Sequence, residues 1–271
     1  WLRRKRLQEQ ALVLDELFAG SIADALTRRE ALSIERVEKA ALSRTPALNA
    51  LDFLAPASQI KILAEVKRAS PSRGQMAEIP DPAALAKIYA ENGASAISVL
   101  TEERKFKGSL ADLVSVRANV SVPLLRKDFI ANEYQILEAR AAGADIVLLI
   151  VAGLAQKDIE RLKHFTEQLG MTAFVETHSE DELKRALDVD TKLVGINARD
   201  LSTFETDRNL FGKLAHLIPH DVIKVAESAV RNSDDVAHYR AAGADVALVG
   251  EALVTNDPAA MLKSFLAAGK S

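Results

Sequence analysis

The chain of 271 residues contains no cysteine, which excludes disulfide bonds, thiolate metal sites and thiol nucleophiles. A reducing, cytoplasmic environment is therefore expected. The sequence also lacks an apolar run of the roughly 18 residues that a membrane span needs, and no cleavage-like site follows its basic N-terminus. We expect an amphipathic helix there and no association with a membrane.

An excess of charge and a metal-binding pattern are missing as well. The net charge is only −3, so no general attraction to nucleic acid is predicted. The five histidines show no metal-ligand spacing, and no cluster of aspartates indicates a divalent cation. No nucleophile elbow is present. We interpret His178, which follows a predicted strand, as a solvated loop residue.

What the sequence does contain is a repeated alternation of apolar runs and helical periodicity after residue 60. This alternation is typical of βα units and a parallel sheet. The eight runs lie near residues 62–67, 96–100, 122–127, 145–150, 171–176, 193–197, 222–227 and 245–249. Eight units predict a closed (β/α)8 TIM barrel. An open doubly wound sheet is the alternative, although no GxGxxG motif follows any of these runs.

An internal repeat supports the count of units. RAAGADIVLLI at 140–150 and RAAGADVALVG at 240–250 are nearly identical, and ENGASAISVL at 91–100 is a looser copy. In each, a glycine stands where a helix should end with a left-handed residue before the next strand. These glycines are Gly93, Gly143 and Gly243.

The first 60 residues show helical patterns and no strand signal. Helices are expected near 4–18 and 22–43, ahead of Pro46 and Pro56. Because no Gly/Ser-rich linker follows, we expect a single domain over residues 1–271. Residues 1–60 would form an extra N-terminal helical segment that caps the barrel of residues 61–271.

Polar side chains stand at the ends of several apolar runs, where a buried strand should not tolerate them. These residues are Glu65, Lys67, Lys127, Glu176, Asn197, Glu227 and Ser228. The carboxyl ends of parallel strands meet at one mouth, so we expect the side chains to gather there. Their proximity should move their pKa values toward neutral pH and permit proton transfer. A purely structural ion network is the alternative.

Phosphate binding is predicted for loops at the same mouth. ASPSRG at 69–74 offers hydroxyls and a turn, with Arg68 and Arg73 as nearby cations. ESAVRN at 227–232 and VGEALV at 249–254 follow the last two strands, where many barrels bind phosphate through backbone N–H groups. Gly250 suits a close approach of the backbone.

Several longer motifs point to a family. AEVKRASPSRG, SVLTEERKFKGS, LLRKDF, GINARDL and VAES occur in this order. With them, residues 10–265 resemble the indole-3-glycerol phosphate synthase family. The resemblance implies a (β/α)8 barrel with an N-terminal helical segment and a cofactor-independent reaction of tryptophan biosynthesis. In it, 1-(2-carboxyphenylamino)-1-deoxyribulose 5-phosphate becomes indole-3-glycerol phosphate, carbon dioxide and water.

The resemblance also implies residue roles. Lys127 would be the general acid of ring closure and Glu176 the general base and acid of dehydration. Glu65 and Asn197 would orient and stabilise the reacting centre. Lys67 would contact substrate anions, at the phosphate or the carboxylate, and is also a candidate for proton transfer. The implied substrate contacts are Ser70 and Arg199 for the carboxylate, Ser228 and the backbone of Gly250 and Glu251 for phosphate, and Phe106, Phe129 and Leu148 for the ring. Glu227 would bind substrate or support the network.

One departure from the family pattern is Ala229, where the family normally has the glycine of AESG. A positive φ there would strain alanine by about 1–2 kcal/mol. A negative φ would only crowd the phosphate. In either case we expect weaker substrate binding more than lost chemistry.

Other readings of the same residues stay open. The chain could be a sugar-phosphate isomerase or a Schiff-base aldolase that uses Lys67 or Lys127. It could also be a non-catalytic barrel that binds a phosphorylated ligand. The expected partner is a small phosphorylated substrate, and the resemblance leaves open a fusion to, or association with, another tryptophan-pathway enzyme.

Overall fold

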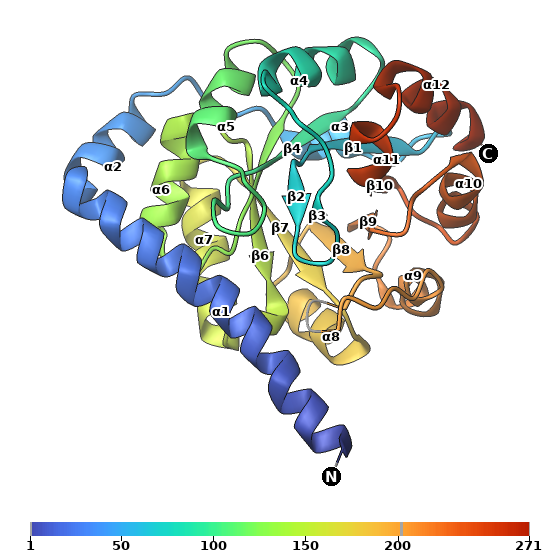
Figure 1. Cartoon of the computed structure of the whole chain (residues 1–271), viewed down its shortest axis with the longest axis horizontal. Helices are drawn as coiled ribbons and strands as arrows, with labels where there is room; N and C mark the ends of the chain where they lie inside the picture. The colour runs from blue at the N-terminus through green and yellow to red at the C-terminus, as the bar shows by residue number, and fades with distance from the viewer. Residues whose placement is uncertain (1, 201–202, 271) are drawn as a thin grey trace.

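The computed structural model describes residues 2–200 and 203–270, with side chains from residue 13 onward. Its centre is a closed barrel of eight parallel strands in the order β1-β10-β9-β8-β7-β6-β5-β4 (Figure 1). The strands are β1 (Lys61–Val66), β4 (Ala96–Leu100), β5 (Leu124–Lys127), β6 (Ile146–Ile150), β7 (Thr172–Thr177), β8 (Leu193–Asn197), β9 (Ile223–Glu227) and β10 (Val246–Val249). The predicted (β/α)8 barrel and its eight strands are confirmed, and the open sheet is excluded.

Burial on both faces explains why these strands were recognisable. All five residues of β6 are buried, and so are all five of β4 and of β8. A strand packed on helices outside and on core residues inside reads as a continuous apolar run. Two short strands, β2 (Ala69–Ser70) and β3 (Gly74–Gln75), form an additional antiparallel hairpin after β1. The sequence analysis expected only a polar loop there.

Helices surround the barrel. They are α4 (Pro82–Glu91), α5 (Leu110–Arg117), α6 (Glu133–Ala142), α7 (Gln156–Gln168), α8 (Glu180–Asp188), α9 (Leu210–Leu214), α10 (Ser233–Ala241), α11 (Glu251–Val254) and α12 (Pro258–Ala268), with 3-10 turns η1 (Val151–Gly153) and η2 (Ala215–Leu217). The predicted left-handed glycines are confirmed, with φ of +94° at Gly93, +96° at Gly143 and +94° at Gly243. Among the described residues, no helix is long and apolar enough to cross a membrane.

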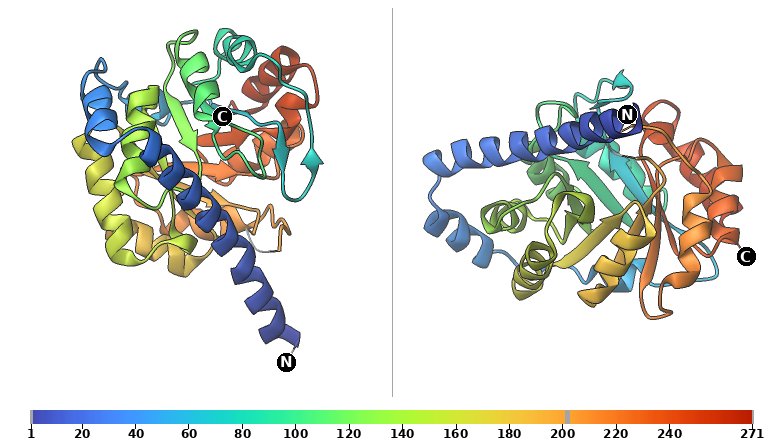
Figure 2. Two further views of the ribbon diagram at one scale, coloured as in Figure 1. Left: turned by 60° about the vertical axis from the view of Figure 1, so that its left-hand side comes forward. Right: turned by 90° about the horizontal axis from the view of Figure 1, so that it is seen from below.

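The N-terminal segment consists of α1 (Leu2–Ala31), α2 (Ile34–Leu42) and α3 (Ala50–Leu54). The expected break between residues 18 and 22 is wrong, because α1 continues through Gly20. Phe18 and Ser21 on either side are buried, and the Phe18 ring packs edge-on against Phe129 at 5.5 Å. Contact with the barrel therefore outweighs the low helix propensity of glycine. The beginning of α1 extends beyond the barrel (Figures 1 and 2).

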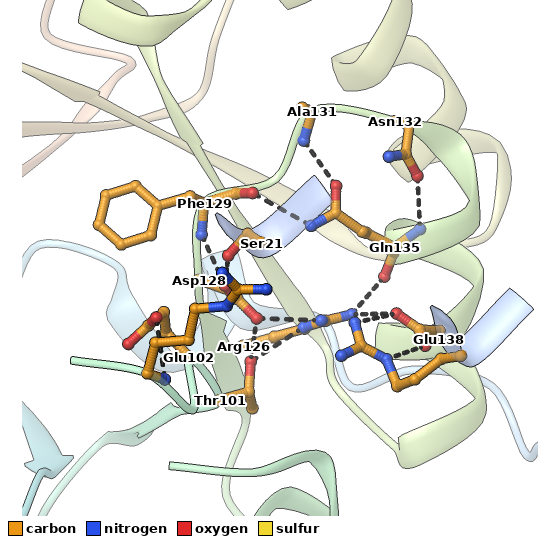
Figure 3. Close-up of polar contacts among 12 residues, drawn as sticks. Ser21, Thr101, Glu102, Arg126, Asp128, Phe129, Ala131, Asn132, Gln135 and Glu138 are labelled. Carbon is orange, nitrogen blue, oxygen red and sulfur yellow. Dashed lines mark hydrogen bonds and ion pairs between the residues drawn. The ribbon is translucent and has the colours of Figure 1, made fainter. Parts of the chain in front are cut away.

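A buried arginine organises the outer side of β5. Arg126 is 0% exposed, and its guanidinium donates to Thr101 Oγ1 at 3.0 Å and to Asp128 Oδ2 at 3.0 Å. It also reaches Glu138 Oε2 on α6 at 3.4 Å (Figure 3). Burial alone would raise the pKa of Asp128, but Arg126 and the hydrogen bonds outweigh it and lower that pKa.

The same cluster fastens α1 to the barrel at two points. Ser21 donates to Asp128 Oδ1 at 2.6 Å, and Arg28 Nε donates to Glu138 Oε1 at 2.5 Å. Figure 3 shows the helix alongside these contacts. Arg126 and Asp128 flank Lys127, so the strand end that carries this lysine is held from both neighbouring positions.

We expect Arg126→Met to lower the free energy of unfolding by about 3–5 kcal/mol, because the buried Asp128 carboxylate loses its cation and Glu138 keeps only Arg28. Urea denaturation followed by circular dichroism measures the change. Arg104→Met is the matched control, since the Arg104–Asp24 pair is exposed, and it should shift the midpoint far less. Equal midpoints for Arg126→Met and wild type would contradict the assignment.

Candidate active site

One pocket opens at the carboxyl ends of the barrel strands. Every residue that the sequence analysis singled out as a site residue lines it: Glu65, Lys67, Ser70, Phe106, Lys127, Phe129, Leu148, Glu176, Asn197, Arg199, Glu227, Ser228, Gly250 and Glu251. Six barrel strands and the loops that follow strands contribute to this set. The closed barrel thus brings together side chains that are up to 186 positions apart, from Glu65 to Glu251.

The centre of the pocket is an ammonium group held between two carboxylates. Lys127 Nζ lies 2.9 Å from Glu176 Oε2 and 2.7 Å from Glu227 Oε2. Lys127 and Glu227 end their strands, whereas Glu176 stands one residue before the end of β7. Gly195 on β8 leaves the room for this arrangement, because a side-chain carbon there would lie 2.1 Å from Glu227 Oε1.

The three groups influence each other's protonation. Burial disfavours the charged ammonium, but Glu176 and Glu227 outweigh it and raise the pKa of Lys127. Burial likewise opposes the Glu176 carboxylate, but Lys127 and the nearby His178 hold its pKa low. For Glu227, burial and repulsion by Glu176 raise the pKa toward neutral pH. The expected shift of the pKa values toward neutral pH is therefore right for Glu227 and wrong for Lys127 and Glu176.

Glu176 is oriented through its other oxygen. Asn197 Nδ2 donates to Glu176 Oε1 at 3.1 Å, and Ser228 Oγ donates to Asn197 Oδ1 at 2.8 Å. The hydroxyl of Ser228 thereby fixes which way the amide of Asn197 faces, and the amide presents a donor to the carboxylate. A polar chain thus connects the loop after β9 with the central carboxylate.

His178 contradicts its interpretation as a solvated loop residue. Its side chain is only 10% exposed, with Nε2 3.2 Å from Glu176 Oε1 and Nδ1 3.1 Å from Glu182 Oε2. The Nε2 contact has the distance of an ion pair without the alignment of a hydrogen bond. Burial lowers the pKa of His178, but the two carboxylates outweigh it and raise that pKa to about 10. Among the described residues, no group of three carboxylate or imidazole side chains is placed to hold a metal ion.

A second ion pair lies on the β1 side of the pocket. Lys67 Nζ, one residue beyond β1, lies 2.7 Å from Glu65 Oε1. Residues two apart along a strand face the same side, and both of these side chains line the pocket. A side-chain carbon at Gly250 would lie 2.5 Å from Glu65 Oε1. Glycine at this position is therefore required for the backbone to pass close to the pair.

Arginines stand at the rim of the pocket. Arg73 pairs with the side chain of Glu251 at 2.6 Å, which offsets the repulsion that this carboxylate would exert on a bound anion. Arg199 donates to Ser72 Oγ at 3.3 Å, and burial lowers its pKa. Arg231 also lines the pocket and was not singled out from the sequence, although it belongs to the ESAVRN motif.

Arg68 does not serve the pocket, although it was expected as a nearby cation. Its guanidinium pairs with Asp112 on α5 at 2.5 Å and donates to the carbonyl of Ile79 at 2.9 Å. The hairpin of β2 and β3 turns the chain so that Ser70 and Arg73 line the pocket, while Arg68 does not.

One wall of the pocket is apolar. The rings of Phe106 and Phe129 lie 6.1 Å apart, and Leu148 lines the pocket with them. Leu100 and Ile150 extend this wall and were missed from the sequence, because each reads as an ordinary core residue at the end of a strand. Such a surface suits a flat aromatic ring.

Comparison with known proteins agrees with this geometry. The family model described as indole-3-glycerol phosphate synthase matches residues 14–265. The chain belongs to this family. A relative of that name from Leifsonia xyli is 64% identical over 253 residues, covering 93% of this chain and 97% of the relative. Further relatives of that name are 53% identical over 262 residues in Mycolicibacterium vanbaalenii and 52% identical over 258 residues in Rhodococcus jostii. The match to the Mycolicibacterium relative covers 96% of this chain and 95% of the relative. The match to the Rhodococcus relative covers 95% of this chain and 96% of the relative.

The departure from the usual family glycine falls on a strained backbone. Ala229 has φ of +60° and follows Ser228, whose φ is +68°. Alanine in the left-handed region costs roughly 1–2 kcal/mol relative to its preferred conformations. Of the two possibilities considered from the sequence, the positive φ that strains alanine is therefore the one observed. The loop that follows β9 stores this strain beside the pocket.

We expect Ala229→Gly to raise the free energy of unfolding by about 1 kcal/mol and to tighten substrate binding, because the strain and the methyl group are both removed. Thermal unfolding and the KM of the family reaction measure the two effects. Ala242→Gly is the control, since its φ of −78° suits alanine, and it should destabilise. Unchanged substrate affinity in Ala229→Gly would contradict the prediction.

His178→Gln should move the acidic limb of the kcat/KM pH profile to higher pH, because Glu176 loses a positive charge that lowers its pKa. With a pKa of about 10, His178 stays charged at neutral pH. Its contribution to stability is present below its unfolded pKa of about 6.5 and is lost as pH rises through about 10. His164→Gln, at an exposed position on α7, should leave the profile unchanged. An identical acidic limb in His178→Gln would refute this role.

Proposed function

We propose that the protein converts 1-(2-carboxyphenylamino)-1-deoxyribulose 5-phosphate into indole-3-glycerol phosphate, carbon dioxide and water. The observation that carries the proposal is the Lys127 ammonium between Glu176 and Glu227 in a pocket with an apolar wall and a cationic rim. The substrate is a small phosphorylated molecule with an aromatic ring and two anionic groups. Family membership supports the same reaction.

The apolar wall supports an assignment of the ring position. Phe106, Phe129 and Leu148 would pack on the anthranilate ring and exclude water from the reacting carbons. Arg199 and Ser70 would bind the ring carboxylate, with Lys67 as a further cation. Burial of Arg199 strengthens its attraction to a carboxylate that enters the pocket.

The opposite end of the substrate would be bound by the loops after the last two strands. Ser228 and the backbone N–H groups of Gly250 and Glu251 are our candidates for the phosphate. Arg73 neutralises the Glu251 side chain, so the phosphate does not meet an unpaired carboxylate there. We add Arg231 to this group, because it lines the pocket and stands three positions after Ser228.

In the first chemical step, Lys127 would donate a proton to the substrate carbonyl oxygen as the ring carbon attacks the carbonyl carbon. The raised pKa keeps the ammonium charged, and an alkoxide is a stronger base than an amine, so the transfer is favourable. Glu227 lies 2.7 Å from Lys127 Nζ, and its raised pKa favours a proton there. It is positioned to reprotonate the amine.

Loss of the ring carboxyl group as carbon dioxide then restores the aromatic ring. Glu176, a carboxylate at the start, takes up the proton that the five-membered ring releases and delivers it to the new hydroxyl, which leaves as water. Asn197 holds Glu176 Oε1, and Glu65 would orient the substrate from the other side of the pocket. One proton from solvent is consumed overall, because the substrate carboxylate leaves as neutral carbon dioxide.

A Schiff-base aldolase is disfavoured by the same central contact. An amine must be neutral to attack a carbonyl, whereas two carboxylates hold Lys127 in the ammonium form. The proposal also includes a location in the cytoplasm and an association with, or fusion to, another tryptophan-pathway enzyme. Both are inferred only from the pathway to which the reaction belongs.

Lys127→Ala and Glu176→Gln should each lower kcat by about 10²–10⁴, because each removes a proton donor or acceptor. The increase in indole fluorescence on mixing with substrate measures turnover, and calorimetry with substrate checks that binding persists. Lys87→Ala, at an exposed position on α4, is the control and should keep full activity. Near-normal turnover in either test variant would refute the assigned role.

A further inference from the structure

A second cavity lies at the opposite end of the barrel, where the strands begin. It has a volume of about 220 Å³ and is bounded by the segment after α2 and by the chain just after α5 and α6. Its charged lining residues are Arg44, Arg117, Arg140 and Asp145. None of them lines the catalytic pocket.

The one carboxylate of this cavity is already satisfied. Asp145 accepts hydrogen bonds from the backbone N–H groups of Leu48 and Leu124, each at 2.8 Å, and pairs with Arg117 at 2.8 Å. These contacts tie the segment after α2 to the starts of β5 and β6. Asp145 therefore balances Arg117 and has little capacity left for the other two arginines.

Arg44 and Arg140 have no carboxylate of their own in this cavity. Arg140 donates to the carbonyl of Thr45, and Arg117 also donates to the carbonyls of Val120 and Val122. The guanidinium of Arg44, an exposed residue whose backbone N–H donates to Ala41, forms no hydrogen bond or ion pair with a described residue. Carbonyl groups account for the positions of Arg117 and Arg140, but they leave Arg44 unexplained.

The arginines are also close together. A side-chain carbon at Gly143 would lie 2.5 Å from both Arg44 Nη2 and Arg117 Cγ, so these atoms are no more than about 5 Å apart. Three guanidinium groups and one carboxylate leave an excess of two charges. The carboxyl ends of α5 and α6 offset this by about half a charge each. Burial and the repulsion of Arg44 outweigh the attraction of Asp145 and lower the pKa of Arg117 and of Arg140.

We propose that this cavity binds a phosphate-like oxyanion through Arg44 and Arg140, with Arg117 and Asp145 as its supporting pair. Guanidinium groups match the geometry of phosphate oxygens and prefer them to solvent when they are partly buried. The volume is sufficient for such an anion together with several waters. The ligand is either free phosphate or the phosphate group of a small ester.

Calorimetric titration with inorganic phosphate at constant ionic strength tests the site. Arg44→Gln should weaken one phosphate-binding event by about tenfold or more, because a charged hydrogen-bond donor is lost. Arg44 is exposed, so the variant should fold, and circular dichroism in chloride checks this. Arg36→Gln removes the same charge from an exposed position on α2, outside the cavity, and should bind phosphate as wild type does.

Two further measurements separate this site from the catalytic pocket and identify the source of the anion. The kcat/KM of Arg44→Gln should equal that of wild type, and phosphate should raise the unfolding temperature of wild type more than that of Arg44→Gln. Titration with glycerol 3-phosphate distinguishes an ester site, where it binds at least as tightly as phosphate, from a site for the free anion. Identical phosphate affinities and identical stabilisation in wild type and Arg44→Gln would overturn the proposal.

Discussion

The contact of Lys127 with Glu176 and Glu227 is the interaction on which the arrangement of the candidate active site depends. Each of these groups would be costly to bury alone, and only their mutual contact makes the cluster tolerable inside the barrel. The cluster is not fully satisfied, since Glu227 Oε1 has no hydrogen-bond partner among the described residues. That deficit favours a proton on Glu227, so the same electrostatic constraint holds the ammonium charged and places an exchangeable proton beside it.

The surrounding structure holds this cluster in place from outside the barrel. Lys127 lines the pocket and Arg126 does not, while Asp128, which also borders the pocket, joins Arg126 in the buried network with α1 and α6. The alternation of side chains along a strand therefore lets one short segment serve the site and anchor the N-terminal helix.

The two ends of the barrel differ in charge. Five cationic and five acidic residues line the candidate active site, whereas the cavity at the strand starts carries three arginines and one aspartate.

Much of the fold was predictable because burial on both faces leaves a strong signal. The strand of residues 146–150 is apolar throughout, and Gly143 before it needs a conformation that other residues rarely adopt. The path of α1 was not predictable, because Gly20 is a poor helix former in isolation. Helix continuity there depends on Phe18 and Ser21, which meet the barrel more than a hundred positions away along the chain.

The sequence by itself determined which polar side chains stand at the strand ends. Lys127, Glu176 and Glu227 each interrupt an apolar run, and a charged side chain there needs either the open end of the barrel or a partner. Tertiary structure alone decided how they pair and which protonation state each prefers, because pKa values depend on burial and on distances of a few ångström. The same limit explains His178, which resembles a loop residue in the sequence but lies buried between two carboxylates. The local sequence pattern shows that a polar side chain needs a partner, whereas the closure of the barrel determines which residue lies close enough to be that partner.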